Sequence, residues 1–172
     1  AAVQVVAQQP VLKQHISHGT YMASAHDEEH DTEQDTWFTA QGEEAGSPLI
    51  FRGRTNVPAG IVEAEYPFLV SVYWPYEPLD EIGMPSDEVN DAHIEFEDLL
   101  EKLDAPGSGF LMLVITGNGQ KEWHWYVAKV DAWMQALNDA LAGQPAFPIE
   151  IEDDHQPDWA LYHEFIARLD GE

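Results

Sequence analysis

The chain has 172 residues, 44% of them hydrophobic, and its 32 acidic and 7 basic side chains give a formal charge of −25. The hydrophobic content excludes a wholly disordered protein, and the charge disfavours nonspecific binding to nucleic acids and anionic membranes. The absence of cysteine excludes disulfides, thiolate nucleophiles and cysteine-bound zinc, and it favours a cytoplasmic location.

Residues 1–35 are expected to form a flexible acidic arm. They are poor in aromatic residues and contain the run His26-Asp27-Glu28-Glu29-His30-Asp31, which offers little to bury. Met22-Ala23-Ser24 resembles a translation start, so residues 1–21 are interpreted as upstream or added sequence. A single folded domain is therefore expected over residues 36–172.

The first part of this domain is predicted to contain a hairpin, a strand and a helix. Residues 37–40 and 49–54 flank a glycine-containing turn, and residues 66–74 are rich in the aromatic and β-branched side chains typical of a strand. Ser86 is a favourable N-cap for an amphipathic helix that ends at Pro106-Gly107. The apolar stripe of that helix consists of Val89, Phe96, Leu99, Leu100 and Leu103.

The second part begins with another predicted hairpin. Residues 110–116 form a nearly continuous apolar run, and Gly117-Asn118-Gly119 is a tight turn into a strand over residues 121–128. The remaining predicted elements are a helix over 130–141, a short strand over 146–151, and a last helix that opens at Pro157 and docks through Trp159, Tyr162 and Phe165.

Residues 66–151 therefore have the order strand–helix–strand–strand–helix–strand. This order predicts an α+β domain with the split βαβ, ferredoxin-like arrangement, in which two helices lie on one face of an antiparallel sheet. The N-terminal hairpin and the C-terminal helix would extend or cover that sheet. An exposed edge of the hairpin would also allow a homo-oligomer to form.

The order of several motifs resembles the bacterial domain-of-unknown-function 695 family over about residues 36–168. The motifs are Trp37-Phe38, Tyr66-Pro67-Phe68-Leu69, Met84-Pro85, Thr116 to Gly119, Trp123 to Tyr126, and Pro157-Asp158-Trp159 with Tyr162 and Phe165. Gln156 stands where that pattern usually has Asp, which removes an N-cap carboxylate. The resemblance implies no established activity. Some family members are similar in layout to, or joined with, an acidic inhibitor of a bacterial ribonuclease, which implies a protein partner.

Four carboxylates follow each other at helical spacing along the first long helix: Glu88, Asp91, Glu95 and Asp98. One interpretation is a solvated face opposite the apolar stripe. The other is a docking face for a basic protein, because like charges on one helix destabilise it and favour neutralisation by a partner. A carboxylate-bridged metal site would need a facing helix that contributes Glu-x-x-His, and none of the predicted helices carries that motif.

The strand over residues 121–128 has Glu122, His124 and Tyr126 on the face opposite its tryptophans. A carboxylate, an imidazole and a phenol together are suited to acid–base catalysis, beside Ser71 and Tyr73 of a neighbouring strand. They are equally suited to be cross-strand pairs beneath another element. Aromatic residues on such a sheet also resemble an RNA-stacking surface, but the basic residues that RNA binding needs are missing.

The His26–His30 string matches the H-x-x-E-H pattern of some zinc proteases. That chemistry needs both histidines on one face of a buried helix and a third ligand. The string lies instead in a polar arm without apolar flanks, so a solvated acidic segment is the preferred interpretation. The sequence predicts no metal site and no cofactor.

Two functions remain open. The first is a non-enzymatic, acidic binding or regulatory module that docks on a basic protein surface. The second is a small enzyme or small-ligand binder that uses the Glu122, His124 and Tyr126 face, with His93 or His155 nearby. A flat acidic face would favour the first function, and a deep pocket with convergent polar groups would favour the second.

Overall fold

The computed structural model describes residues 37–170, so the arm predicted over residues 1–35, with its His26–His30 string, lies outside the described residues. In chain order the strands and α-helices are β1 (Trp37–Glu44), β2 (Ser47–Arg54), β3 (Phe68–Pro75), α1 (Asp87–Leu99), β4 (Gly109–Gly117), β5 (Gln120–Val127), α2 (Val130–Leu141), β6 (Glu150–His155) and α3 (Ala160–Asp170). Two short 3₁₀ turns, Glu63–Glu65 and Glu101–Leu103, precede β3 and follow α1.

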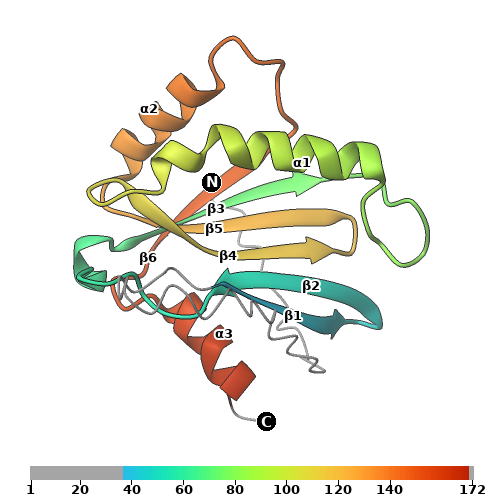
Figure 1. Cartoon of the computed structure of the whole chain (residues 1–172), viewed down its shortest axis with the longest axis horizontal. Coiled ribbons are helices and arrows are strands. Elements are labelled where there is room, and N and C mark those ends of the chain that lie inside the picture. The colour runs from blue at the N-terminus through green and yellow to red at the C-terminus, as the bar shows by residue number, and fades with distance from the viewer. Residues whose placement is uncertain (1–36, 171–172) are drawn as a thin grey trace, which may run out of the picture.

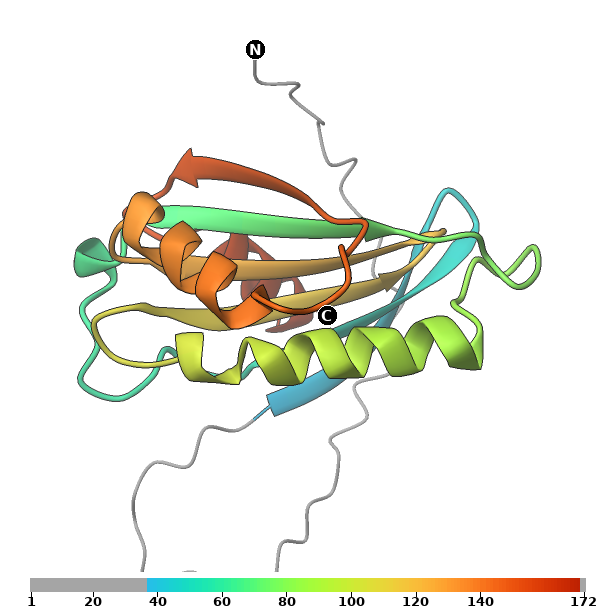
Figure 2. The same ribbon diagram turned by 90° about the horizontal axis from the view of Figure 1, so that it is seen from above.

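The strands form one six-stranded sheet in the order β1-β2-β4-β5-β3-β6, and every neighbouring pair is antiparallel. Helices α1 and α2 lie on one face of the sheet, and α3 lies on the other (Figures 1 and 2). The predicted α+β class is confirmed. Strands β1 and β6 form the two edges of the described sheet.

Two-residue turns close both hairpins. Ala45 and Gly46 join β1 to β2 with φ angles of 49° and 86°, and Asn118 and Gly119 join β4 to β5 with φ angles of 53° and 76°. Turns with two positive φ angles match the right-handed twist of the strands they connect. The first hairpin is longer than predicted because its turn needs only two residues.

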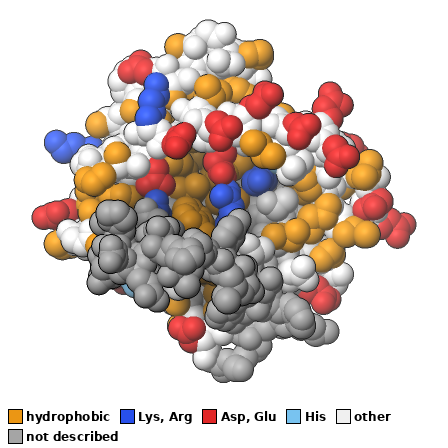
Figure 3. Space-filling view, in the orientation of Figure 1, with side chains coloured by type: hydrophobic (Ala, Val, Ile, Leu, Met, Phe, Trp, Pro, Cys, Tyr) orange, Lys and Arg blue, Asp and Glu red, His pale blue; other side chains and the backbone are white. Residues whose placement is uncertain are grey.

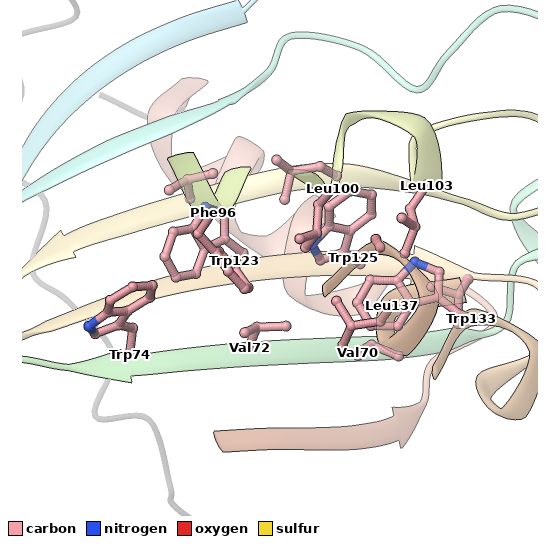
Figure 4. Packing of buried hydrophobic residues seen from close by; sticks show 14 residues of the cluster. Val70, Val72, Trp74, Phe96, Leu100, Leu103, Trp123, Trp125, Trp133 and Leu137 are labelled. Atoms are coloured by element: carbon pink, nitrogen blue, oxygen red, sulfur yellow. The ribbon is translucent and has the colours of Figure 1, made fainter. Parts of the chain in front are cut away.

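The main core lies between the sheet and helices α1 and α2 (Figure 4). Trp123 and Trp125 of β5 point into this core, which leaves Glu122 and His124 on the opposite face of the sheet. The ring of Trp123 lies 5.1 Å from Phe96 of α1, and the ring of Trp125 lies 5.4 Å from Trp133 of α2. Such aromatic contacts add to the hydrophobic stabilisation that holds both helices on the sheet.

Helix α3 is anchored on the opposite face by aromatic side chains. The buried ring of Trp159 stacks on Tyr126 with a centroid distance of 4.5 Å, and its Nε1–H donates to the Tyr66 carbonyl oxygen at 2.9 Å. Phe165 lies 4.9 Å from Phe51 of β2. The predicted docking of the last helix by its aromatic residues is confirmed.

The boundaries of the last two elements differ from the prediction. Strand β6 covers Glu150–His155 instead of residues 146–151, because Phe147 and Ile149 pack against the core without joining the sheet. The apolar pattern therefore marked a packed loop, while the paired strand is mostly acidic. Acidic side chains on an edge strand discourage pairing with another chain. Helix α3 begins at Ala160, since Trp159 has a φ angle of 51° that no helical residue adopts.

Candidate functional site

Helix α1 begins where the sequence predicts. The Ser86 hydroxyl accepts a hydrogen bond from the Val89 backbone N–H at 3.2 Å, and Asp87 and Glu88 follow in the first turn. Negative charge at this end of a helix is favourable because the backbone N–H groups there carry partial positive charge. His93 and Phe96 are the fully buried side chains of α1, so the helix has a defined inner face.

All four predicted docking residues lie on the outer side of α1. The side chains of Glu88, Asp91, Glu95 and Asp98 are exposed. Acidic side chains follow the line of α1 on the molecular surface (Figure 3). Ile94 lies among them and is 51% exposed, so the acidic face also presents an apolar side chain to solvent.

The acids near the end of α1 are placed unfavourably for helix stability. The last turn contains Glu97 and Asp98 but no basic residue, and Glu95 lies just before it. The carbonyl groups at a helix C-terminus carry partial negative charge, so carboxylates there destabilise the helix by about 0.3–1 kcal/mol each at low salt. Helix stability therefore does not explain this arrangement of charge.

Two other carboxylates of this region are engaged within the domain. Glu97 Oε1 accepts a hydrogen bond from Trp123 Nε1 at 2.9 Å and also pairs with Arg52 of β2. Asp104 accepts hydrogen bonds from Arg54 Nη2 on both carboxylate oxygens, at 2.8 and 2.7 Å. These contacts tie α1 and the turn after it to the sheet, so Glu97 and Asp104 differ in role from the exposed acids.

A hydrogen-bonded chain of polar side chains lies on the α3 face of the sheet. The antiparallel register places Ser71 of β3 directly opposite His124 of β5, and Tyr73 opposite Glu122. The Ser71 Oγ lies 2.8 Å from His124 Nδ1, and His124 Nε2 lies 3.2 Å from Glu122 Oε2. The ring of Tyr73 packs beside them, with its centroid 6.2 Å from that of His124. A hydroxyl, an imidazole and a carboxylate are therefore linked in series, with a phenol next to them.

In this series of hydrogen-bonded side chains, Ser71 and His124 are buried, whereas Glu122 reaches solvent. Ser71 is 5% exposed and His124 is 6% exposed, whereas the Glu122 side chain is 24% exposed. Buried polar groups are tolerated when their hydrogen bonds are made, and here each group has a partner. The hydrogen bonds assign the imidazole Nε2–H to Glu122, which leaves the Nδ1 lone pair facing the Ser71 hydroxyl.

Their surroundings shift the pKa values of Glu122 and Tyr73 in opposite directions. Burial would raise the pKa of Glu122, but the hydrogen bond and charge of His124, with a hydrogen bond from Gln120, hold that pKa below its usual value. Burial raises the pKa of Tyr73 to about 12, the Ser71 hydrogen bond opposes this, and the charges of Glu122 and Glu152 add to it. At neutral pH the carboxylate is therefore ionised and the phenol keeps its proton.

Tyr126, the third residue predicted for this face, lies beneath α3 and is not hydrogen-bonded to Ser71, His124 or Glu122. Its hydroxyl donates to Gln156 Oε1 at 3.0 Å and accepts from the Tyr162 backbone N–H at 3.3 Å. Burial raises its pKa. Gln156 Oε1 also accepts from the Leu161 backbone N–H at 3.1 Å, so this amide provides the capping oxygen that the missing Asp would have supplied.

Sequence reasoning placed Ser71 and Tyr73 beside the predicted site but did not count them as site residues. The signal was the strand register, which pairs residues 53 positions apart and cannot be read from local periodicity. His93 and His155, the other histidines considered, lie elsewhere. His93 is fully buried against Trp74 in the main core, and the exposed His155 packs on Phe68 at the β6 edge.

The backbone around Ser71 limits the chemistry of this site. Strand β3 is paired on both sides, with β5 and with β6, so its N–H groups are committed to the sheet. An oxyanion would need a side-chain donor, and the phenol of Tyr73, two residues from Ser71 on the same face of β3, keeps its proton at neutral pH. Among residues 37–170, no group of three or more metal-binding side chains is placed to hold an ion. No helix in the same range is long and apolar enough to cross a bilayer.

Comparison with known proteins identifies the family of the chain. A family of unknown function (DUF695) matches residues 35–167, which is the stretch that the sequence motifs indicated. No curated protein and no solved structure matches the chain. Because the family match covers most of the 172 residues, the chain belongs to DUF695.

Proposed function

We propose that this protein is a non-enzymatic binding module whose α1 face docks on a basic surface of another protein. The observation that carries the proposal is the outer side of α1, where Glu88, Asp91, Glu95 and Asp98 are exposed around the apolar Ile94. An acidic rim around an apolar side chain suits a basic partner with a small apolar patch.

The acids on this face destabilise α1, and a feature that is unfavourable for folding supports a role in binding. Asp98 lies in the last turn of α1 and opposes the helix dipole, and no basic residue in that turn compensates it. A basic partner would relieve both the dipole conflict and the mutual repulsion of the carboxylates. The charge of −25 further favours fast, salt-sensitive association with basic proteins over nucleic acids or anionic membranes. The absence of cysteine supports a cytoplasmic setting.

The test is differential capture from a lysate of the native host with the full chain as bait. The bait variants are Glu95→Lys with Asp98→Lys, and a control with Asp139→Lys and Glu164→Lys on α2 and α3, where both acids are also exposed. Both double variants change the net charge by the same amount. The proposal expects a basic protein that elutes at moderate salt, is lost with the α1 variant and is retained by the control. Equal loss with both variants would refute the α1 face as the docking site.

We also propose that β3 to β6 form a ferredoxin-like unit extended by the β1–β2 hairpin. The order β4-β5-β3-β6 supports this, since the third strand of the unit lies beside the first and the fourth forms an edge. The placement of α1 and α2 on one face gives the same support (Figure 1). A second copy could pair with the β1 edge, and sedimentation of the purified chain would detect it.

A second candidate function is a small enzyme or small-ligand binder on the α3 face. The chain Glu122–His124–Ser71 favours it, because a buried imidazole held between a carboxylate and a hydroxyl is an arrangement suited to proton transfer. A basic partner on α1 would not cover this site, since α1 lies on the other face of the sheet (Figure 2). The two functions can therefore be tested independently.

A further inference from the structure

We propose that Ser71 is a nucleophile for acyl transfer and that His124 is its general base. This inference rests on the second candidate function and is independent of docking through α1. The main observation in support is the distance of 2.8 Å between Ser71 Oγ and His124 Nδ1, which lies within the range needed for proton transfer. Glu122 holds the opposite ring nitrogen at 3.2 Å and acts as a positioning residue.

The arrangement uses the imidazole in the opposite sense from the familiar serine triad. In that triad the serine faces Nε2 and the carboxylate faces Nδ1. Here Ser71 faces Nδ1 and Glu122 faces Nε2. Either nitrogen of a neutral imidazole accepts a proton while the other donates, so the reversal keeps the base function. The ionised Glu122 would stabilise the imidazolium that forms.

Tyr73 is placed to stabilise the oxyanion. It lies two residues from Ser71 on the same side of β3, its ring centroid lies 6.2 Å from that of His124, and it keeps its proton at neutral pH. A phenol that remains protonated can donate to the oxygen on which charge develops during acyl transfer. Tyr73 would thus donate the hydrogen bond to the oxyanion that the backbone N–H groups of β3 cannot donate, because they are already bonded within the sheet.

The proposed reaction is hydrolysis of an ester. Ser71 Oγ forms a bond to the carbonyl carbon, the carbonyl electron pair moves to oxygen near Tyr73, and the hydroxyl proton passes to His124 Nδ1. The bond to the alcohol then breaks, and the leaving oxygen takes that proton. Water attacks the acyl-serine by the same route and releases the acid, which restores Ser71.

The charges around the site restrict the substrate. The register places Glu152 opposite Ser71 and Glu150 opposite Tyr73, and both side chains are exposed. With the ionised Glu122, these carboxylates repel anionic substrates. The expected substrate class is therefore small esters that are uncharged or carry a cationic group.

The test is labelling of the folded full chain with an uncharged alkyl fluorophosphonate, followed by intact-mass and peptide mass spectrometry. Attack by Ser71 Oγ on phosphorus releases fluoride and leaves a stable adduct. The proposal expects one adduct at Ser71, none in Ser71→Ala, and wild-type labelling in the control Ser108→Ala. Absence of an adduct at Ser71 in the folded wild type would overturn the nucleophile without depending on any variant.

Variants of the partners separate catalysis from structure. His124→Gln and Tyr73→Phe should each slow labelling by about tenfold or more. Glu122→Gln should slow it similarly, while Glu122→Asp should recover part of the rate, which a purely structural carboxylate would not explain. Equal labelling rates in wild type and in a folded His124→Gln variant would overturn the general-base role.

The side-chain NMR signals of His124, recorded with 4-nitrophenyl acetate, test the nucleophile separately from the second candidate function on which it rests. A shift of these signals together with a Ser71 adduct supports both. A shift without an adduct overturns the nucleophile and leaves ligand binding standing. If the His124 signals do not shift and no adduct forms, the second candidate function is refuted as well.

Discussion

Replacing His93 with leucine should make the folded domain less sensitive to acid. The imidazole of His93 is fully buried, and its ring centroid lies 4.7 Å from that of Trp74 and 5.7 Å from that of Trp123. Neither ring nitrogen has a hydrogen-bond partner among the described residues. Burial, with a smaller effect from the charge of Lys121, lowers the pKa of His93 from 6.5 to about 4.

The sign and size of the effect follow from this pKa difference. Below pH 6.5 the unfolded chain binds a proton at His93 that the folded chain does not, so stability falls as the pH drops from 6.5 towards 4. Linkage then gives a loss of about 2 kcal/mol in the free energy of unfolding between pH 7 and pH 5. Leucine has a similar volume and cannot titrate. At pH 7 the variant should therefore differ from wild type by only about 1 kcal/mol.

The assay is urea unfolding at pH 7 and pH 5 at equal ionic strength, followed by tryptophan fluorescence. Other groups also titrate in this interval, so the informative quantity is the pH-dependent loss of wild type minus that of His93→Leu. His155→Gln is the matched control, since His155 is exposed and should leave the loss unchanged. Equal losses in wild type and His93→Leu would refute a neutral, buried His93.

Three further outcomes are expected in the same unfolding assay. Neutralising the acids near the end of α1 with Glu95→Gln and Asp98→Asn should stabilise the domain by about 0.3–1 kcal/mol at low salt, chiefly through Asp98 in the last turn, while weakening capture of a basic partner, and a loss of stability would contradict the dipole argument. Glu97→Ala removes the acceptor of the Trp123 indole and the partner of Arg52, so it should cost about 1–3 kcal/mol, whereas Glu95→Ala should not. Trp159→Ala empties the contact between α3 and Tyr126 and should cost about 3–5 kcal/mol, and a smaller change would mean that α3 contributes little to the fold.

The local patterns of the sequence determined which side of each element faces the core. The alternation in β5 placed Trp123 and Trp125 on one face and Glu122 and His124 on the other, because successive strand residues point to opposite faces. The spacing of Phe96 and the exposed Glu95 and Asp98 oriented α1 in the same way. The helical period also places His93 with Phe96, one turn away, so its burial was accessible to the same reasoning.

The tertiary structure decided which faces meet. Periodicity cannot show that Ser71 lies opposite His124, because that contact depends on the pairing of β3 with β5. Nor could it show that α3 covers Tyr126 and leaves Glu122 partly exposed. The position of β6 was likewise set by pairing with β3, against the apolar pattern of residues 146–151. Burial preference acts within each element, whereas register and helix docking depend on contacts between residues far apart in the chain.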